Sequence, residues 1–570
     1  MKELSILTPP DLQVNYKKIS DVTIHDLALD VICGNISENK NEKEIIRRFM
    51  SNMTDDARVT KYRVEVFEDL MRFPQMRKKM VELLEQIDFL RSYGTFKPGY
   101  EESAGAWDLL HRLSEIRDYI NCVESMYECL SGIDIKSEGL INIRNYVSDL
   151  FEDKGFAELK EDISKIKADT STLKSVTLGV NLNERFEADG IGIISLNSKP
   201  FKDAGLLNNL SGKLYAKDSV NISEEWNGDM KFREVSNTEF LSSAAMSSEK
   251  FARMNGIMTH PLLASSMATV PDGDASNAME YMDKVASQMI SLSVKKLREV
   301  LLKHVSVSIR DISNLIPEFI YYIRWAEYIE NLQKKGVHFC KPHVMESDSS
   351  ERQMRARGIY NLKLLELASN DMSSITTNDL DFDEDKRVYI LTGANRGGKT
   401  TITQAIGQLF VLAQGGIFIP GDSFEFSPVD GIFTHFPADE DKTLDLGRLG
   451  EECQRFKELY SECSKTSLLL LNETFSTTSF EEGYYIAFDA VKAILEKGIR
   501  TIYNTHMHKL AYEIDTINEV NGDGKAASLI VKAEEGNRTY KVEVAPPVGK
   551  SFAKDIAKKY GVTYDQLTQS

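Results

Sequence analysis

Apolar residues in the first 175 positions return at intervals of three and four residues, which is the spacing of an amphipathic helix. The pattern is clearest in the stretches EKEIIRRFMSNM, RVEVFEDLMRFPQMRKKMVELLEQIDFL and INIRNYVSDLFEDKGFAELKEDISKI, which are separated by short polar turns. Because the apolar face of each helix has to be covered by another element, the pattern predicts a helical domain over residues 1–175.

The pattern changes between residues 176 and 260. The stretch SVTLGVNLNERFEADGIGIISLNSKPF is rich in β-branched residues and glycine, which are typical of short strands and turns. After it, VPDGDASNAMEYM predicts a turn and a helix capped near Ser276. From there to Gly336 the only proline is Pro317 and no glycine occurs, so we expect a long helix or two helices in line. We therefore predict a small β-containing insertion over residues 176–260, and long lever helices with a connector over residues 261–372.

Apolar strands alternate with helical stretches from about residue 380 almost to the end of the chain, a pattern typical of an α/β domain. We assign this domain to residues 373–570. A chain of 570 residues is longer than one hydrophobic core normally supports, which is about 250–300 residues. The predicted fold class is therefore multidomain, with a mainly α-helical core and lever region followed by an α/β domain.

Charge and composition exclude several classes of protein. A net charge of −18 argues against a protein that coats nucleic acid through overall positive charge, although it leaves room for a local basic face. The run with Lys295, Lys296 and Arg298 could contact phosphates, but a solvated helix face is the more common meaning of such a run. The six cysteines lack the paired spacing of a zinc site, and no stretch approaches about 18 uninterrupted apolar residues. We therefore expect reduced thiols, no membrane span and a soluble, cytoplasmic protein.

The stretch LTGANRGGKTT, residues 391–401, fits the pattern G-x-x-x-x-G-K-[ST] and follows the apolar run VYIL. In such a loop, glycines let backbone N–H groups turn toward the phosphates, the lysine reaches the β- and γ-phosphates, and the hydroxyl is placed for Mg²⁺. The helix that follows adds the positive end of its dipole. The α/β domain is thus predicted to be a P-loop nucleoside triphosphatase that binds phosphates through Gly393, Ala394, Asn395, Arg396, Gly397, Gly398, Lys399, Thr400 and Thr401.

Two later stretches place polar residues where predicted strands end. Asn472 and Glu473 follow four leucines in LLLLNETFSTTS, and the strand of TIYNTHMHKL ends at His506. Ligands of open α/β sheets lie at the carboxyl ends of the strands, so these side chains should lie beside the phosphate loop. Asn472 takes the position of an aspartate that usually supports the magnesium shell, and its amide carries no charge. We therefore expect weaker Mg²⁺ binding and slow hydrolysis, and we assign His508 to an ordinary polar position at a helix start.

Five ordered motifs in residues 375–562 resemble one known family. TGANRGGKTT is similar to T-G-P-N-x-x-G-K-S-T, and LLLLNETFSTTSFEEG to L-V-L-x-D-E-x-G-R-G-T-S-x-x-D-G. The other three are GGIFIPGDSFEFSPVDGIFTHFPADED, YNTHMHKL and YKVEVAPPVGKSFAKDIAKKYGV. Together they resemble the MutS family of DNA mismatch-repair ATPases, which is related to the ABC-type ATPases that dimerise around nucleotide.

The resemblance implies a set of roles for the matching residues. ATP and Mg²⁺ would be the cofactors. Catalysis would rest on Glu473, which activates water, on Lys399, and on His506, which senses the γ-phosphate. The metal would be held by Thr400, by Glu473 and, through a water, by Asn472.

The resemblance also extends to the base and to a second subunit. TTND, residues 376–379, resembles the segment beside the adenine, with Asn378 matching, and Ile375 stands where the family has a stacking aromatic. The segment Gly447–Gly450 resembles an ABC-type signature, which a partner subunit would place against ATP. The implied partners are therefore a second copy of the chain, duplex DNA and other repair proteins, with no membrane.

The sequence also departs from the family. Helices similar to the family's core domain begin near residue 20, so we expect no N-terminal mismatch-reading domain. The tripeptide Phe156-Ala157-Glu158 spells the family's mismatch wedge, but it lies in a helical pattern and is interpreted as coincidence. Because the chain ends at Ser570, neither the family's helix-turn-helix tail nor a nuclease domain is expected.

Two functional hypotheses remain. The first is an ATP-dependent, slowly hydrolysing dimer that acts on branched or otherwise structured DNA, associated with the nucleoid. The second is a nucleotide-gated protein scaffold without DNA contact, which the acidic charge favours. They differ in whether the basic run near residue 296 and the Arg355–Arg357 region line one concave face. An ABC-type transport ATPase is disfavoured, because no membrane signal is present and the motifs follow the MutS pattern.

Overall fold

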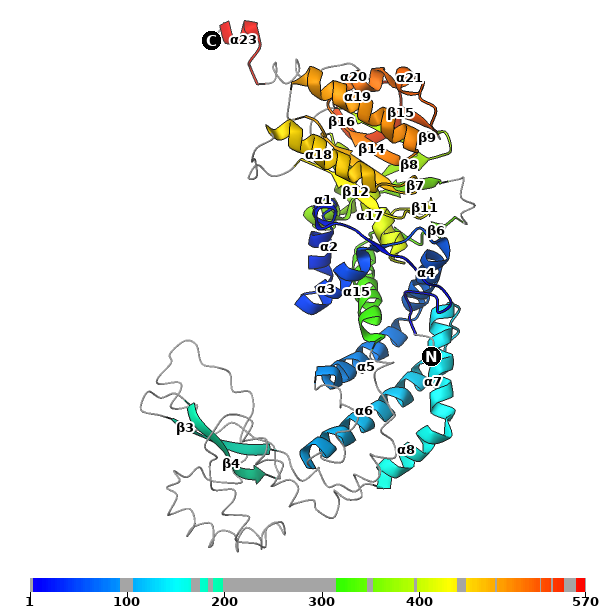
Figure 1. Ribbon diagram of the computed structural model, residues 1–570, viewed down its shortest axis with the longest axis vertical. Helices are drawn as coiled ribbons and strands as arrows, with labels where there is room; N and C mark the ends of the chain where they lie inside the picture. Colours follow the sequence, from blue (N-terminus) through cyan, green and yellow to red (C-terminus); the bar gives the residue numbers. More distant parts are fainter. Residues whose placement is uncertain are drawn as a thin grey trace, which may run out of the picture. The chain divides into compact units, whose positions relative to one another are not determined.

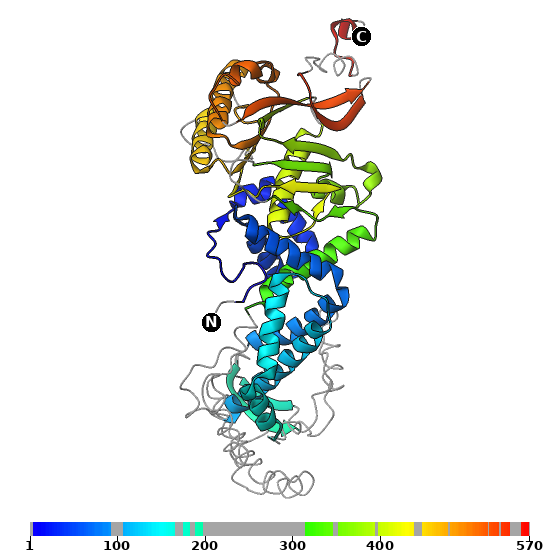
Figure 2. The same cartoon turned by 90° about the vertical axis from the view of Figure 1, so that its right-hand side faces the viewer.

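Figures 1 and 2 show the protein as a computed structural model. The structure groups the chain into two compact units, one formed by residues 1–85, 128–146 and 310–570 and the other by residues 86–127 and 147–309. The four-part division drawn from the sequence stays a prediction. The residues that the structure describes are 4–92, 106–165, 175–182, 188–197, 314–345, 352–393, 397–437, 447–476, 479–522, 524–534, 537–547 and 560–568.

The N-terminal part of the chain is helical, as the apolar spacing indicates. Side chains of Ser20, Asn39 and Asp56 accept hydrogen bonds from first-turn amides and so fix where three helices begin. A short strand pair, β1 (Lys17–Lys18) with β2 (Asn52–Met53), closes the first three helices. The helices are α1 (Asp21–Asp26), α2 (Leu29–Ile36), α3 (Lys40–Met50), α4 (Ala57–Arg72), α5 (Pro74–Ser92), α6 (Ala106–Ser131), α7 (Glu138–Glu152) and α8 (Lys154–Lys165).

The second unit, taken by itself, contains packed helices and a strand pair. Tyr127 and Phe151 stack with ring centroids 4.2 Å apart, and Phe156 contacts Phe151 and Tyr119. The strands β3 (Ser175–Leu182) and β4 (Ala188–Asn197) are antiparallel, in the stretch for which strands are predicted. The rest of the predicted insertion, the helix start at Ser276 and the basic run with Lys295, Lys296 and Arg298 lie outside the described residues.

The C-terminal end of the predicted lever is helix α15 (Ile316–Gln333) in the first unit. Pro317 stands in its first turn, where a proline removes no intrahelical hydrogen bond. Tyr321, Tyr322 and Trp325 of this helix are fully buried. Because residues 198–313 lie outside the described part of the chain, the lever itself stays a prediction.

A six-stranded sheet forms the centre of the C-terminal region, in the order β12-β13-β14-β9-β15-β16. All neighbouring pairs are parallel except β15 with the edge strand β16. Helices cover both faces, with α17 against β13 and β14 and with α19, α20 and α21 on the opposite side. The strands are β9 (Lys386–Thr392), β12 (Ile432–His435), β13 (Leu468–Asn472), β14 (Arg500–Asn504), β15 (Lys525–Glu534) and β16 (Asn537–Val544).

The prediction of an α/β fold is confirmed for this region. Strand β13 begins with four leucines because both of its faces are buried. A second sheet has the order β6-β11-β7-β8, and β10 pairs with β5. The strands of the second sheet are β6 (His343–Val344), β7 (Met354–Ile359), β8 (Asn378–Phe382) and β11 (Ser423–Phe426), and those of the separate pair are β5 (Phe339–Cys340) and β10 (Ile419–Pro420). The remaining elements are α16 (Leu362–Leu367), the 3₁₀ turn η2 (Met372–Ser374), α17 (Lys399–Gln414), α18 (Gly447–Glu462), α19 (Phe480–Lys497), α20 (His508–Tyr512), α21 (Ile514–Ile517) and α23 (Tyr564–Thr568).

Helices from the start of the chain share their core with α17. The side chains of Gln404 and Gln408 donate to the carbonyl oxygens of Asp26 and Leu27 at 2.7 and 2.9 Å. Leu27 packs so closely that a Cβ on Gly407 would lie 2.4 Å from it. The nucleotide-loop helix and the corner between α1 and α2 therefore form one packed body.

Candidate functional site

The loop between β9 and α17 has the backbone of a phosphate-binding loop. Gly393 and Gly398 have φ angles of 149° and 92°, in the region that favours glycine. A Cβ on Gly393 would also lie 3.0 Å from the Cβ of Val531. Since α17 begins at Lys399, the N–H groups of its first turn and the positive end of its dipole lie at the loop. Residues 394–396, which are also predicted to bind phosphate, lie outside the described part of the chain.

Lys399 is buried at the foot of this loop. Its side chain is 5% exposed, and Nζ donates to the carbonyl oxygen of Gly393 at 3.2 Å. Burial lowers the pKa of Lys399, while the Glu473 carboxylate acts in the opposite direction. A phosphate at the loop would reverse this shift, because it supplies negative charge at close range.

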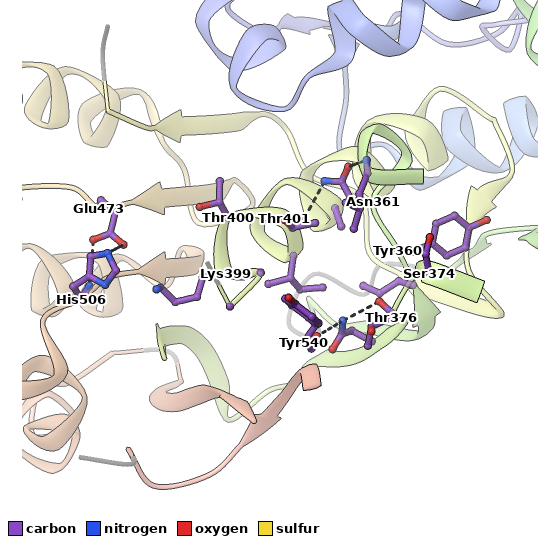
Figure 3. A pocket seen from close by; sticks show the side chains of 17 residues that line it. Tyr360, Asn361, Ser374, Thr376, Lys399, Thr400, Thr401, Glu473, His506 and Tyr540 are labelled. Atoms are coloured by element: carbon purple, nitrogen blue, oxygen red, sulfur yellow. Dashed lines mark hydrogen bonds and ion pairs between the residues drawn. The ribbon is translucent and has the colours of Figure 1, made fainter. Parts of the chain in front are cut away.

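A cavity of about 760 Å³ opens beside the loop, within the range of ligand pockets in proteins (Figure 3). It is lined by several of the predicted site residues, which come from four separate stretches of the chain. These are Gly397, Gly398, Lys399, Thr400, Thr401, Asn378, Glu473 and His506. The structure thus brings together the phosphate loop, the ends of β13 and β14, and the start of β8.

Glu473 and His506 lie next to one another at one end of the pocket, with their side chains pointing toward each other (Figure 3). The Oε1 atom of Glu473 lies 3.0 Å from Nε2 of His506, and its Oε2 accepts from the His506 backbone N–H at 3.2 Å. Glu473 has a φ angle of 53°, a left-handed conformation that costs a non-glycine residue about 1–2 kcal/mol. Backbone strain of this kind gathers at functional sites, and here it turns the carboxylate toward the histidine.

Thr400, Asn472 and Asn504 form a hydrogen-bonded group beside the loop, which we call the magnesium corner because Thr400 and Asn472 are predicted to hold Mg²⁺. The Thr400 hydroxyl donates to Oδ1 of Asn472 at 3.1 Å. Asn504, which the sequence did not single out, donates its side-chain amide to the same Oδ1 and to Oγ1 of Thr400, the latter at 3.3 Å. No cluster of three His, Cys, Asp or Glu side chains in the described residues is arranged to hold a metal.

The side of the pocket predicted for the base is built differently from the expectation. Ile375 is buried and does not line the cavity, whereas Tyr540 of β16 lines it with 46% of its surface exposed. Asn378 accepts from the Val542 N–H at 2.8 Å and donates to the carbonyl oxygen of Tyr540 at 3.1 Å. Asn378 therefore fastens β8 to β16 and holds the Tyr540 backbone in place.

Residues 389–568 match the family model for MutS domain V. The chain carries a MutS ATPase domain. This confirms the resemblance found in the five motifs, and it agrees with the loop, the strand ends and the pocket described above. None of the helices in the described residues has the length and apolar character needed to cross a membrane.

Curated relatives match over about two fifths to one half of the chain. The DNA mismatch repair protein MutS of Prochlorococcus marinus (strain MIT 9312) is 30% identical over 245 residues, 41% of this chain and 26% of that protein. Endonuclease MutS2 of Finegoldia magna is 26% identical over 259 residues, with shares of 45% and 32%. Endonuclease MutS2 of Caldicellulosiruptor bescii is 27% identical over 295 residues, with shares of 51% and 37%. The match thus spans less than two fifths of these relatives' own length.

Two other segments that the sequence analysis singled out can be placed. Helix α18 begins at Gly447, so the segment Gly447–Gly450 forms its first turn. Arg355 lies 3.4 Å from Glu425, and Arg357 pairs with both carboxylate oxygens of Asp381. Both arginines therefore pair with carboxylates on neighbouring strands of the second sheet.

Sequence reasoning missed several residues of this site, among them Asn504 and Tyr540. Asn504 had a visible signal, because it is a polar residue at the end of the apolar stretch TIY and directly precedes the Thr505-His506 motif. Tyr540 had none, since only the pairing of β16 with β15 brings it to the pocket. His508, in contrast, lies at the first position of α20, as expected.

Proposed function

We propose that the protein is an ATPase of the MutS family that acts on DNA as a dimer closed by ATP. The observation that carries the proposal is the pocket in which the phosphate loop, Glu473 and His506 converge. Its 760 Å³ volume is large enough for a nucleotide, and its buried lysine provides the charge that phosphates need.

The residues of the pocket suggest a division of labour. The N–H groups at the start of α17 and the ammonium group of Lys399 would hold the phosphates. Glu473 would orient and deprotonate the attacking water once it turns from His506 toward the γ-phosphate. His506 would then be released to donate a hydrogen bond to that phosphate. Each turnover would require the Glu473 side chain to leave His506, and this extra step supports slow hydrolysis.

The residues of the magnesium corner fit a tightly held Mg²⁺ poorly. Mg²⁺ prefers an octahedral shell of oxygen ligands, commonly including one or two carboxylates. The corner offers the Thr400 hydroxyl and the Asn472 amide oxygen, while the Glu473 carboxylate is turned toward His506. The Asn504 amide directs N–H donors at both oxygens.

DNA and a second copy of the chain are the partners that the relatives' names and the family support. Relatives named for DNA mismatch repair match the ATPase half. In a dimer, the Gly447–Gly450 turn at the start of α18 would approach the nucleotide of the other copy. The substrate would be a branched or otherwise structured duplex, and the site of action the cytoplasm and nucleoid.

A nucleotide-gated scaffold without DNA contact is the second candidate. It is favoured by the net charge of −18 and by the ion pairs that hold Arg355 and Arg357. Such a protein would bind ATP in the same pocket, and only its partner would differ.

Steady-state ATP hydrolysis with and without duplex and branched DNA, at low and moderate salt, separates the two candidates. Lys399→Ala supplies the blank, because it removes the buried ammonium group. Stimulation by DNA that weakens with salt supports the DNA-acting ATPase. Basal turnover that no DNA changes, together with no DNA binding in the presence or absence of ATP, refutes it and favours the scaffold.

A further inference from the structure

Two asparagines lie side by side at the magnesium corner because their strands are in register. Asn472 ends β13, Asn504 ends β14, and the two residues are direct partners in the parallel pairing. Asn504 is fully buried and Asn472 is 7% exposed. Thr400, the first-turn residue of α17, completes the group by its bond of 3.1 Å to Asn472.

The Asn504 side chain directs an N–H₂ group into this corner. Its Nδ2 atom donates to Oδ1 of Asn472 and to Oγ1 of Thr400. When two carboxamides face each other, the N–H₂ group of one has to donate to the oxygen of the other. One N–H₂ group therefore lies in the corner even if both side-chain amides are flipped. Oδ1 of Asn504 is buried without a hydrogen-bond partner among the described residues. A buried acceptor without a partner is destabilising, so the two contacts of the N–H₂ group have to offset the unpaired Oδ1 atom.

An N–H₂ group in this position does what a bound cation would do. It presents positive partial charge to both oxygens, Oγ1 of Thr400 and Oδ1 of Asn472, and draws them together. The same hydrogens would repel a metal ion that approached those oxygens. A neutral asparagine in place of the aspartate removes the negative charge that would otherwise outweigh this repulsion.

We propose that this site binds its nucleotide without a requirement for Mg²⁺, and that Asn504 sets this preference. The ligand is a metal-free nucleoside triphosphate, whose phosphates are met by Lys399 and by the N–H groups at the start of α17. The inference rests on the proposed function, in which this pocket binds ATP. It concerns affinity, and it is independent of whether DNA or a protein is the partner.

Equilibrium binding of a fluorescent ATP analogue to the full chain, in excess MgCl₂ and in excess EDTA, tests the proposal. We expect the dissociation constants of the wild-type protein in the two conditions to agree within about threefold, a difference of less than 1 kcal/mol. The double variant Asn472→Asp, Asn504→Ala restores a carboxylate and removes the donor. Its affinity should be at least about tenfold higher in MgCl₂ than in EDTA.

Two further variants complete the design. Asn521→Ala removes an exposed asparagine of the same domain and should leave the wild-type ratio unchanged. If the double variant does not fold, Asn504→Ser removes the long amide and should also raise the dependence on Mg²⁺. Thermal shifts by ATP, measured with MgCl₂ and with EDTA, provide a second readout of binding for every variant.

The outcomes separate the two levels of the hypothesis. Wild-type binding that is more than about threefold weaker in EDTA overturns the role of Asn504 and leaves ATP binding intact. An unchanged ratio in the variants that lack Asn504 also overturns it. Absence of binding in both conditions refutes the proposed function, and the inference with it.

Discussion

Replacement of His435 by glutamine should remove part of the acid sensitivity of the fold. His435 ends β12 with 2% of its surface exposed, and Nδ1 lies 3.1 Å from the Thr474 hydroxyl. Burial lowers the pKa of His435 to about 4, and the Arg455 guanidinium adds to the effect. Its Nε2 is buried without a hydrogen-bond partner among the described residues, so a proton there would be poorly accommodated.

The sign and size of the effect follow from linkage. A histidine in the unfolded chain has a pKa of about 6.5, so between about pH 6.5 and about pH 4 the unfolded state binds the proton and the folded state does not. Stability is therefore lost as the pH falls through this window. The difference of about 2.5 pKa units corresponds to about 3 kcal/mol at the acid end, at about 1.4 kcal/mol for each unit.

The measurement is the free energy of unfolding in urea at about pH 7.5 and about pH 4.5, for the wild type and His435→Gln. Tryptophan fluorescence can report it, because Trp325 is fully buried in the same unit. Groups other than His435 titrate alike in both proteins, so the difference between their pH responses isolates this side chain. His343→Gln, at an exposed position of β6, is the matched control and should behave like the wild type. Equal losses of stability in wild type and His435→Gln would refute the reasoning.

Three other substitutions have defined outcomes. Glu473→Gln should retain ATP binding and lose ATP turnover by at least about a hundredfold, as measured by phosphate release; wild-type-like turnover would exclude Glu473 as the base. Gln414→Leu breaks three hydrogen bonds of 2.8 Å, to Thr54 and Val429. It should lower the free energy of unfolding, measured in urea, by about 3–6 kcal/mol. The exposed control Gln454→Leu should change the free energy of unfolding by less than about 0.5 kcal/mol. Because burial lowers the pKa of Lys399, ATP affinity should fall as the pH rises through that lowered value toward about 10.5. Lys399→Ala should bind ATP weakly and show no such fall. If the affinities of the wild type and of Lys399→Ala change with pH in the same way, the prediction is wrong.

The parts of the site that the sequence predicts are those held by a few contiguous residues. The loop from Gly393 to Thr400 needs only local backbone conformation and the helix that follows it. Glu473 and His506 could be placed because each ends an apolar strand, and the carboxyl ends of parallel strands meet at one edge. Their direct contact, however, depends on the φ angle of Glu473, which no sequence pattern predicts.

The rest depends on pairings between distant segments. Asn504 lies beside Asn472 only because β13 and β14 pair in this register. Tyr540 reaches the pocket only because β16 pairs with β15 as an antiparallel edge strand. Tyr540, one of the tyrosines that line the pocket, therefore comes from β16, whereas the family resemblance places a stacking aromatic at position 375. In the same way, the helical pattern near the start of the chain predicts apolar faces but not that α17 would cover them.

The packing of the first helices on α17 constrains the order in which the protein can fold during synthesis. The amides of Gln404 and Gln408 that bind the α1–α2 corner follow their carbonyl partners by 378 and 381 residues. Arg63 likewise donates to the Gln414 carbonyl oxygen across 351 residues. Leu27 and its neighbours in the nascent N-terminal helices therefore stay uncovered by α17 until that helix has left the ribosome. At about 5–20 residues per second this interval lasts tens of seconds, during which these helices are a natural target for chaperones.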